Sequence, residues 1–316
     1  MKIVVLDALT LGPGLDLSCL EQVGQTKIYD LTSPEELPER IRDAEVIVTN
    51  KWKLNGDNLS GAEKLKLICV TATGFDCIDT AYCRSRGIGV CNVPAYSTES
   101  VAQLTMTMAL YLAAHLGQYR EWISSGAYSA SGVANLLSPV WHELAGKTWG
   151  VIGGGNIGRR VAHLARAFGC RVIMYRRKPE TEFEAADLDT LLRQSDIISV
   201  HVPLTEETRN LIGRAEIARM KPGVIFINVA RGAVCDEEAL TEAVEQGLIG
   251  GLGVDVFSVE PFPESHPFTR IRNLPHVCLT PHIAWGAVET RNRCLRIVAE
   301  NIRIFGEGGS QNRVEK

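Results

Sequence analysis

Short apolar runs alternate with amphipathic helical patterns over the first hundred residues. Three of the runs are rich in β-branched residues, as buried strands usually are, and they cover Ile3–Leu6, Val46–Thr49 and Leu67–Thr71. Residues 34–42 have a helical pattern, with Ser33 as a candidate N-cap and acidic residues in the first turn. This alternation predicts a parallel sheet with helices on both faces.

The pattern changes near Thr98. Residues 98–124 carry one helical periodicity, with Glu99 in the first turn and Gly126 after the end, and they predict a single long helix. Residues 127–147 have no periodicity. Because loops of this length usually have a function or bind a partner, we expect this segment to pack on a second subunit or on another domain.

From Thr148 the alternation restarts and becomes more regular. Six strands are expected, at 148–152, 171–175, 197–200, 224–228, 252–256 and 277–280. Helices are expected between most of them, at 156–168, 187–194, 214–220 and 237–246. Six strands joined by right-handed crossovers make a complete doubly wound sheet. A last amphipathic helix is expected over residues 288–305.

Length and composition fit two ordinary globular domains. The chain has 316 residues, of which 45% are hydrophobic and 22% charged. A net charge of -4 gives no indication of a nucleic acid or an anionic membrane as a partner. The most apolar helical stretch, 101–114, is too short and too polar to cross a bilayer.

The cysteines and the N-terminus indicate in which cellular compartment the protein resides. There are nine cysteines and no Cys-x-x-Cys pair. Reduced thiols are therefore expected, rather than disulfides or a metal site. The N-terminus lacks the apolar length and the cleavage site of a signal peptide. We expect a cytoplasmic protein without a metal ion.

A glycine-rich turn follows the first strand of the second half. It reads Gly153-Gly-Gly-Asn-Ile-Gly158 and leads into a helix. Gly153 would make the tight turn, Gly155 would let a pyrophosphate approach the backbone, and Gly158 would let the helix pack on the strand. The first N–H groups of the helix, around Asn156 and Ile157, would hold the phosphates. A dinucleotide site is predicted, with an ordinary βα turn as the alternative.

The end of the next strand bears on which dinucleotide binds. An acidic residue there would accept a hydrogen bond from the ribose 2′-hydroxyl and indicate NAD. The chain instead has Arg176 and Arg177 after Tyr175, and guanidinium groups fit a 2′-phosphate. This favours NADP(H), while a backbone or water contact with the 2′-hydroxyl could still admit NAD(H).

Three segments in the last third begin at the ends of expected strands and run into the loops that follow. They are Asn228–Gly232, Asp255–Pro261 and Thr280–Trp285, and they supply Arg231, Glu260 and His282. Each residue alone has an ordinary explanation, as a surface arginine, a turn cap or a packed core histidine. Because the carboxyl ends of the strands in a doubly wound sheet face the ligand crevice, the three together favour one catalytic site.

These side chains suit hydride transfer to a 2-keto acid. The Arg231 guanidinium can bind the substrate carboxylate bidentately and polarise the carbonyl. His282 can donate a proton to the carbonyl oxygen, and it can accept that proton in the oxidation. Glu260, near the other ring nitrogen, would fix the tautomer and keep more of the histidine protonated near neutral pH.

Four further motifs, with the segments above, resemble the D-2-hydroxyacid dehydrogenase family over essentially the whole chain. They are Thr73–Asp79, Ser97–Gln103, Glu143–Lys147 before the glycine turn, and His201–Thr205. The resemblance implies an α/β protein with two Rossmann-like doubly wound parallel-sheet domains and an active site in the cleft between them. Residues 1–98 and 286–316 would bind the substrate and residues 99–285 the dinucleotide. Members are typically homodimers, and residues 127–147 would be the dimer arm.

The resemblance also implies roles for single residues. The main chain at Thr73, Gly74 and Phe75 would meet the substrate carboxylate. Thr98 and Asp255 would lie near the nicotinamide. The remaining contacts of the cofactor groove would come from His201, Pro203, Val229 and Ala230.

Two features are similar to the glycerate dehydrogenase and hydroxypyruvate reductase branch. Trp285 stands where many relatives carry glycine, and Asn50-Lys51 follows the second expected strand. Trp285 would contact a small polar substrate or plug the hinge between the domains. We therefore expect an NAD(P)-dependent oxidoreductase that reduces hydroxypyruvate or glyoxylate.

The sequence is also compatible with other functions. Pyruvate or a branched 2-keto acid is an alternative substrate. A nonenzymatic NAD(P)-sensing protein, similar to the C-terminal-binding corepressors, is an alternative function, and turnover of NADPH with any 2-keto acid would exclude it. A formate dehydrogenase is disfavoured, since that group carries glutamine where this chain has Glu260.

Overall fold

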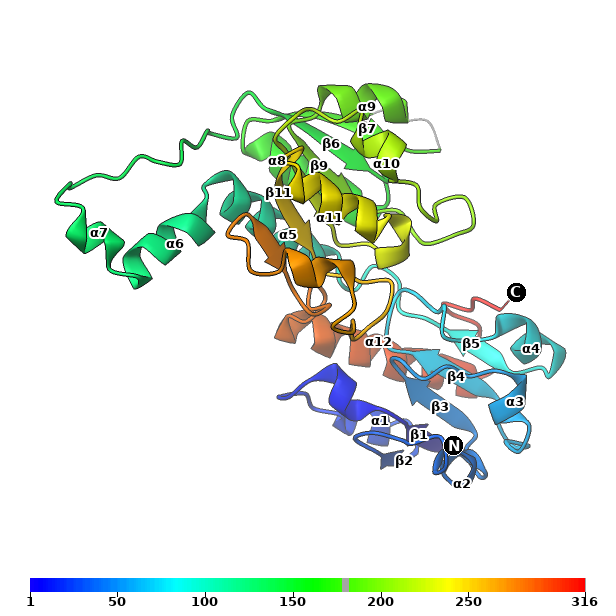
Figure 1. Cartoon of the computed structure of the whole chain (residues 1–316). Coiled ribbons are helices and arrows are strands. Elements are labelled where there is room, and N and C mark those ends of the chain that lie inside the picture. The colour runs from blue at the N-terminus through cyan, green and yellow to red at the C-terminus, as the bar shows by residue number, and fades with distance from the viewer. Residues whose placement is uncertain (178–181, 316) are drawn as a thin grey trace. The chain divides into compact units, whose positions relative to one another are not determined.

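The chain forms two compact units. The computed structural model describes residues 1–177 and 182–315. One unit consists of Met1–Ser97 and the segment that starts at Trp285, and the other is Thr98–Ala284. Each unit is built on a parallel sheet (Figure 1), which confirms the predicted α/β fold class.

The first unit has a five-stranded sheet in the order β2-β1-β3-β4-β5. Its strands are β1 (Lys2–Val5), β2 (Gln25–Ile28), β3 (Val46–Thr49), β4 (Leu67–Val70) and β5 (Gly89–Cys91). The two edge strands were not predicted, because β2 is mostly exposed and polar and β5 has only three residues. The strand order reverses between β1 and β3, where ligands bind in open α/β sheets.

Helices cover both faces of this sheet, as Figure 1 shows. They are α1 (Ser18–Glu21), α2 (Leu37–Ile41), α3 (Gly56–Leu59), α4 (Thr80–Ser85) and α12 (Val288–Gly306). The long helix α12 packs Cys294, Val298 and Ile302 against one face, and α2 packs Leu37 and Ile41 against the other. A 3-10 turn, η1 (Ala8–Leu11), follows β1.

Helix α2 is shorter than predicted. Ser33 does cap the segment, since its hydroxyl accepts from the Glu36 N–H at 3.4 Å and its own N–H donates to the Glu36 carboxylate at 2.8 Å. The α-helix begins only at Leu37, however, with a proline in its first turn. The three residues after Ser33 form hydrogen-bonded turns instead.

The second unit has a seven-stranded parallel sheet in the order β12-β11-β10-β9-β6-β7-β8. The strands are β6 (Thr148–Ile152), β7 (Arg171–Tyr175), β8 (Glu184–Ala185), β9 (Ile197–Val200), β10 (Val224–Asn228), β11 (Ile249–Val254) and β12 (Val277–Leu279). The prediction of six strands missed β8, a two-residue edge strand with no apolar run. The order reverses between β6 and β9, beside the glycine turn.

Helices pack on both faces of this sheet as well. They are α5 (Thr98–Ala113), α8 (Asn156–Ala167), α9 (Leu188–Gln194), α10 (Arg214–Ile217) and α11 (Glu237–Glu245), with the 3-10 turns η2 (Gly232–Val234) and η3 (Pro267–Arg270). Helices α5 and α8 share one hydrophobic cluster with Trp149 and Val151, while α9, α10 and α11 share another with Ile198 and Phe226. Strand β11 begins three residues earlier than predicted, and its glycines admit side chains of α5.

The predicted single helix over 98–124 is wrong. His115 adopts the left-handed conformation, with φ 51°, and this ends α5 and starts α6 (Leu116–Ser124) in a new direction. A four-residue helix, α7 (Ala127–Ala130), follows in the segment expected to be irregular. Neither α6 nor α7 contains a buried residue, and Figure 1 shows both standing away from the sheet of their unit.

Within the described part of the chain, no helix is long and apolar enough to cross a membrane.

Candidate active site

Three neighbouring strands of the second unit carry the predicted catalytic residues at their carboxyl ends. Strands β10, β11 and β12 are consecutive in the sheet. Arg231 comes three residues after β10, and His282 comes three residues after β12. The loop after β11 carries Glu260. The topology thus brings three segments that are distant in sequence to one sheet edge.

Glu260 and His282 are hydrogen-bonded to each other. Glu260 Oε2 lies 2.7 Å from His282 Nδ1. The other carboxylate oxygen, Oε1, accepts a hydrogen bond from the Phe257 N–H at 3.0 Å. A carboxylate at Nδ1 fixes the proton there and leaves Nε2 as the atom for acid/base chemistry. The side chains are 23% and 29% exposed, so the pair lies at the surface of its unit, within reach of a small molecule.

Asp255 holds the turn that carries His282. Its Oδ1 accepts from the Thr280 hydroxyl at 2.6 Å and the Ile283 N–H at 2.8 Å, and its Oδ2 accepts from the Ala284 N–H at 2.8 Å. His282 itself has φ 54°, a left-handed conformation that a non-glycine residue rarely adopts without support. Asp255 therefore supports the backbone conformation that aims the histidine.

The Asp255 carboxyl is fully buried. Burial raises its pKa, and the hydrogen bonds from Thr280 and the two N–H groups act in the opposite direction. The family resemblance implied that Asp255 lies near the nicotinamide and did not indicate this role in the turn. The structure shows what its carboxylate binds inside the unit, and the contact with the nicotinamide stays a prediction.

The turn that carries Arg231 is held by Asn228. The Asn228 side chain accepts from the Ala230 N–H at 3.0 Å and donates to the Arg231 carbonyl at 3.0 Å. The half-buried Arg231 guanidinium donates to the Ala230 carbonyl at 2.8 Å. An asparagine at a strand end often bonds to the backbone of the following turn. This role of Asn228 could therefore have been inferred from the sequence.

Gly232 brings this turn against the Glu260 loop. A Cβ atom on Gly232 would lie 2.1 Å from the Phe257 carbonyl carbon and 2.2 Å from the Ser258 nitrogen. The absence of a side chain at Gly232 is therefore required for the two backbones to pack. Phe257 is also the residue whose N–H binds Glu260. A shift of the Arg231 turn would therefore displace the backbone that holds the Glu260–His282 pair.

The glycine turn after β6 has the geometry of a phosphate-binding turn. Gly153 has φ 108°, and a Cβ there would lie 2.7 Å from the His201 carbonyl. A Cβ on Gly158 would lie 1.9 Å from the Gly153 oxygen. A Cβ on Gly155 would meet no atom within 4 Å, so the space beside it is open. No side chain caps the first turn of α8, where Asn156 and Ile157 begin the helix, and its N–H groups suit an anion.

His201 follows β9 at the same switch point. Its Nε2 lies 3.0 Å from the Ser199 hydroxyl, which also accepts from Trp149 Nε1 at 2.9 Å. Its Nδ1 is buried and makes no hydrogen bond to any of the described residues. Burial lowers the pKa of His201 to about 3, so the ring is neutral at physiological pH. An unpaired buried nitrogen beside Gly153 fits a site that a polar ligand completes.

The two arginines after β7 have different surroundings. Arg177 is exposed and forms an ion pair with Glu207 at 2.9 Å. Arg176 is half-buried. A Cβ atom on Gly154 would lie only 2.7 Å from the Cδ atom of Arg176. Arg176 therefore lies directly over the glycine turn, whereas Arg177 projects toward the 203–208 loop. Pro203 is exposed in that loop, and its carbonyl accepts from the Thr208 hydroxyl at 2.6 Å.

The other residues predicted to contact the cofactor lie at element ends of the second unit. Thr98 is the first residue of α5 and is half-buried. Val229 and Ala230 follow β10 directly, and Val229 is buried. Val229 and Ala230 lie between the strand and Arg231, and their contact with the cofactor stays a prediction.

The predicted substrate loop follows β4 in the first unit. The Thr73 hydroxyl donates to the Val93 carbonyl at 2.9 Å, and the Thr73 carbonyl accepts from Asn92 Nδ2 at 2.7 Å. Gly74 and Phe75 come next, with Phe75 packed on the core of the unit. Trp285 also packs on a hydrophobic cluster of this unit, around α12. Its effect on substrate choice stays a prediction.

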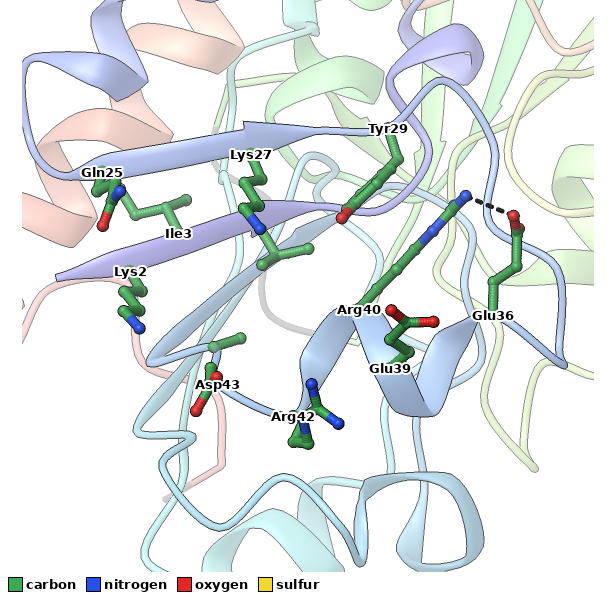
Figure 2. A pocket seen from close by; sticks show the side chains of 12 residues that line it. Lys2, Ile3, Gln25, Lys27, Tyr29, Glu36, Glu39, Arg40, Arg42 and Asp43 are labelled. Atoms are coloured by element: carbon green, nitrogen blue, oxygen red, sulfur yellow. Dashed lines mark hydrogen bonds and ion pairs between the residues drawn. The ribbon is translucent and has the colours of Figure 1, made fainter.

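A separate groove of about 440 Å³ lies in the first unit. Figure 2 shows it between β1, β2 and α2, with a lysine from each strand and both acidic and basic side chains from α2. Arg40 crosses it, pairing with Glu36 at 2.7 Å and stacking on the Tyr29 ring at 4.0 Å. Its lining contains none of the residues predicted to bind substrate or cofactor.

Comparison with known proteins identifies the family. A family model described as the NAD binding domain of D-isomer specific 2-hydroxyacid dehydrogenases matches residues 106–284. The chain is 35% identical to a hydroxypyruvate reductase of Blautia hydrogenotrophica, over 100% of both chains. It is 39% identical to a glyoxylate reductase of Thermococcus litoralis, covering 86% of this chain and 83% of the relative. The chain belongs to the D-isomer specific 2-hydroxyacid dehydrogenase family.

Solved structures agree with this membership. A D-lactate dehydrogenase from Aquifex aeolicus, complexed with NAD and lactic acid, superposes with a TM-score of 0.87 at 32% identity. The match covers 100% of this chain and 99% of that one. The predicted family is confirmed, and the protein is a dehydrogenase that acts on CH–OH groups with a nicotinamide cofactor.

Among the described residues, no group of three or more His, Cys, Asp and Glu side chains is arranged to hold a metal ion.

Proposed function

We propose that this dehydrogenase reduces a small 2-keto acid, hydroxypyruvate or glyoxylate, to the D-2-hydroxy acid with NADPH. The observation that carries the proposal is the 2.7 Å Glu260–His282 pair on the sheet edge that also carries Arg231. One edge thus offers a proton donor and an anion-binding group, which a 2-keto acid requires.

Each of the three residues has one role. Arg231 binds the substrate carboxylate with two parallel N–H groups and orients the keto oxygen. His282 gives its Nε2 proton to that oxygen as the keto carbon is reduced, and it takes the proton back in the oxidation. Glu260 holds the Nδ1 proton and stabilises the imidazolium.

The second unit would hold the dinucleotide. Gly153, Gly155 and the first turn of α8 would bind the pyrophosphate, and the buried Nδ1 of His201 would meet a polar group of the ligand. Thr98, Pro203, Val229, Ala230 and Asp255 would make the remaining contacts. A bound dihydronicotinamide supplies the hydride that reduces the keto carbon.

The first unit would bind the substrate carboxylate through the main chain at Thr73, Gly74 and Phe75. The side-chain bonds of Thr73 and Asn92 hold this loop in place. Trp285 would favour a small polar substrate. Relatives named hydroxypyruvate reductase and glyoxylate reductase support this choice.

NADPH is proposed over NADH because of Arg176. Its position over Gly154 suits a 2′-phosphate, and neither Arg176 nor Arg177 offers an acceptor for a 2′-hydroxyl. Replacing Arg176 by alanine should raise the KM for NADPH about tenfold or more and leave the KM for NADH nearly unchanged, since a charge-assisted hydrogen bond is worth about 1.5–3 kcal/mol. A wild-type enzyme that prefers NADH would refute this part.

A substrate panel tests the proposal. Hydroxypyruvate, glyoxylate, pyruvate and a branched 2-keto acid are each supplied with NADPH and with NADH, and kcat/KM is measured. The highest value is expected for hydroxypyruvate or glyoxylate with NADPH. A preference for pyruvate or the branched acid would refute the substrate assignment and leave the reaction type intact.

We also propose that the segment 127–147, with α6 and α7, joins two copies into a homodimer. Large apolar side chains in and around it are exposed, among them Ile123, Leu137, Val140 and Trp141. Such surface usually marks an interface. Light scattering should give the mass of a dimer, and Leu137→Asp with Trp141→Ala should lower it to that of one chain; a monomeric wild type would exclude the proposal.

The thiols suit a reducing compartment, and we propose the cytoplasm. All nine cysteines lie in described residues and none forms a disulfide. Cell fractionation tests this.

A further inference from the structure

A second hydrogen-bonded network contacts the loop after β11, which carries Glu260. Glu237 is the first residue of α11. Its Oε1 accepts from the Ser258 N–H at 2.8 Å, and its Oε2 accepts from the Ser258 hydroxyl and lies 3.0 Å from His266 Nε2. The Glu237 and His266 side chains are only 10% and 5% exposed. A buried carboxylate that contacts three donors is well fixed.

The tautomer of His266 is set by its other nitrogen. The Phe268 N–H donates to His266 Nδ1 at 3.2 Å, so the ring carries its proton on Nε2 and donates a hydrogen bond from there to Glu237. The ring is enclosed by Phe257, Phe262 and Phe268, with centroid distances of 6.0, 4.8 and 5.1 Å. His266 therefore cannot turn away from Glu237 without disturbing this aromatic cluster.

The network ends on the loop that carries Glu260. Two consecutive amides of that loop donate to two different carboxylates. Phe257 N–H donates to Glu260, and Ser258 N–H donates to Glu237. Only the φ and ψ angles of Phe257 separate the two amides, and packing of the Phe257 ring against Phe262, His266 and Phe268 restricts both angles. Glu237 thus fixes the direction from which the Phe257 N–H reaches Glu260.

We propose that Glu237 and His266 are positioning residues for the reaction. They hold the Phe257–Ser258 peptide so that Glu260 meets His282 in the geometry for proton transfer. The inference rests on the roles proposed above for Glu260 and His282. Without Glu237, the Ser258 N–H loses its acceptor, and the loop is free to shift away from His282.

A purely structural role would make a different prediction. If Glu237 only stabilised the fold, its loss would lower the melting temperature and would leave kcat of the folded enzyme unchanged. If it acts through Glu260, its loss should reduce kcat only while Glu260 is present. A double-mutant cycle between the two positions separates these cases.

The test compares Glu237→Ala, Glu260→Ala and the double variant, with Glu238→Ala as a matched control. Glu238 is the next residue of α11, where it pairs with Arg270 at 2.8 Å on the surface. Glu237→Ala should lower kcat roughly 10–100-fold with NADPH affinity unchanged, since misplacement by about 1 Å can cost 10²-fold. Glu238→Ala should stay within about twofold of wild type.

In the Glu260→Ala background, adding Glu237→Ala should change kcat by less than about threefold. An equal loss in both backgrounds, or a lowered melting temperature with normal kcat, would overturn the inference. If Glu237→Ala does not fold, Glu237→Gln takes its place under the same criterion, because one amide oxygen cannot accept from both the Ser258 N–H and the His266 N–H. If Glu260→Ala and His282→Ala both keep wild-type turnover, the proposed function fails instead.

Discussion

Gly232→Ala should damage catalysis, although it adds only one methyl group. The glycine lies next to Arg231, and the added Cβ would stand 2.1 Å from the Phe257 carbonyl carbon and 2.2 Å from the Ser258 nitrogen. Ordinary contacts of a Cβ begin at 3.4 Å. One of the two backbones must therefore move by about 1 Å, and no flexible side chain is available to absorb the overlap.

The displaced peptide is part of the site. It follows the Phe257 N–H that binds Glu260, and it includes the Ser258 N–H that binds Glu237. Overpacking of this kind costs about 1–3 kcal/mol of stability. A shift of about 1 Å in a positioning group can cost on the order of 10²-fold in rate. We expect kcat to fall by about that factor, while the folded protein still binds NADPH.

The assay is steady-state reduction of hydroxypyruvate, followed at 340 nm, with thermal unfolding measured on the same samples. Gly61→Ala is the control, because a Cβ there meets no atom within 4 Å and its backbone is not in the left-handed region. It should leave kcat and the melting temperature unchanged. A Gly232→Ala enzyme with wild-type kcat would refute the coupling between the Arg231 turn and the Glu260 loop.

Two stability predictions follow from buried carboxylates of the first unit. Asp7 accepts hydrogen bonds from Thr49 Oγ1 at 3.1 Å and from the Asn50 and Lys51 N–H groups at 3.0 and 2.7 Å. Asp7→Asn should destabilise the fold by about 1–3 kcal/mol in urea unfolding, because an amide cannot serve all three donors; an unchanged midpoint would contradict this. Burial acts to raise the pKa of Glu315, but hydrogen bonds from Arg313 and the Val90 N–H outweigh it and lower the pKa from 4.5. A lowered pKa adds stability above pH 4.5 that is lost as the pH falls through the folded-state value, so Glu315→Gln should destabilise at pH 7 and lose its effect in acid. A difference that persisted at low pH would argue against this linkage.

Much of the fold was predictable because the buried strands carry a strong local signal. Thr148–Ile152 and Val224–Asn228 are apolar runs with clear ends, and the structure has them as predicted. The missed strands β2 and β8 are polar edges, which need no apolar run. The break at His115 depends on a left-handed residue that is not glycine. Gly117 lies two residues later, but a single glycine is tolerated inside a helix and does not by itself predict a break.

For the candidate site, the sequence predicted which residues come together at the strand ends, but not how their side chains are held. The positions of Arg231 and His282 follow from parallel topology, since neighbouring carboxyl ends share one edge. The hydrogen bonds that orient these side chains do not follow from the topology. Asp255 reaches residues 25 to 29 positions away, and Glu237 reaches Ser258 across 21 positions. Such pairs arise from tertiary packing, and no local pattern marks them.

The central claim is that His282, held by Glu260, transfers the proton to and from the substrate oxygen. The most direct measurement is the turnover of His282→Ala with hydroxypyruvate, alongside a fluorescence titration of NADPH on the same preparation. A general acid contributes about 10²–10⁴-fold, so kcat should fall by at least that range while NADPH binds as in wild type. Near-normal turnover, or loss of NADPH binding in a folded variant, would contradict the account.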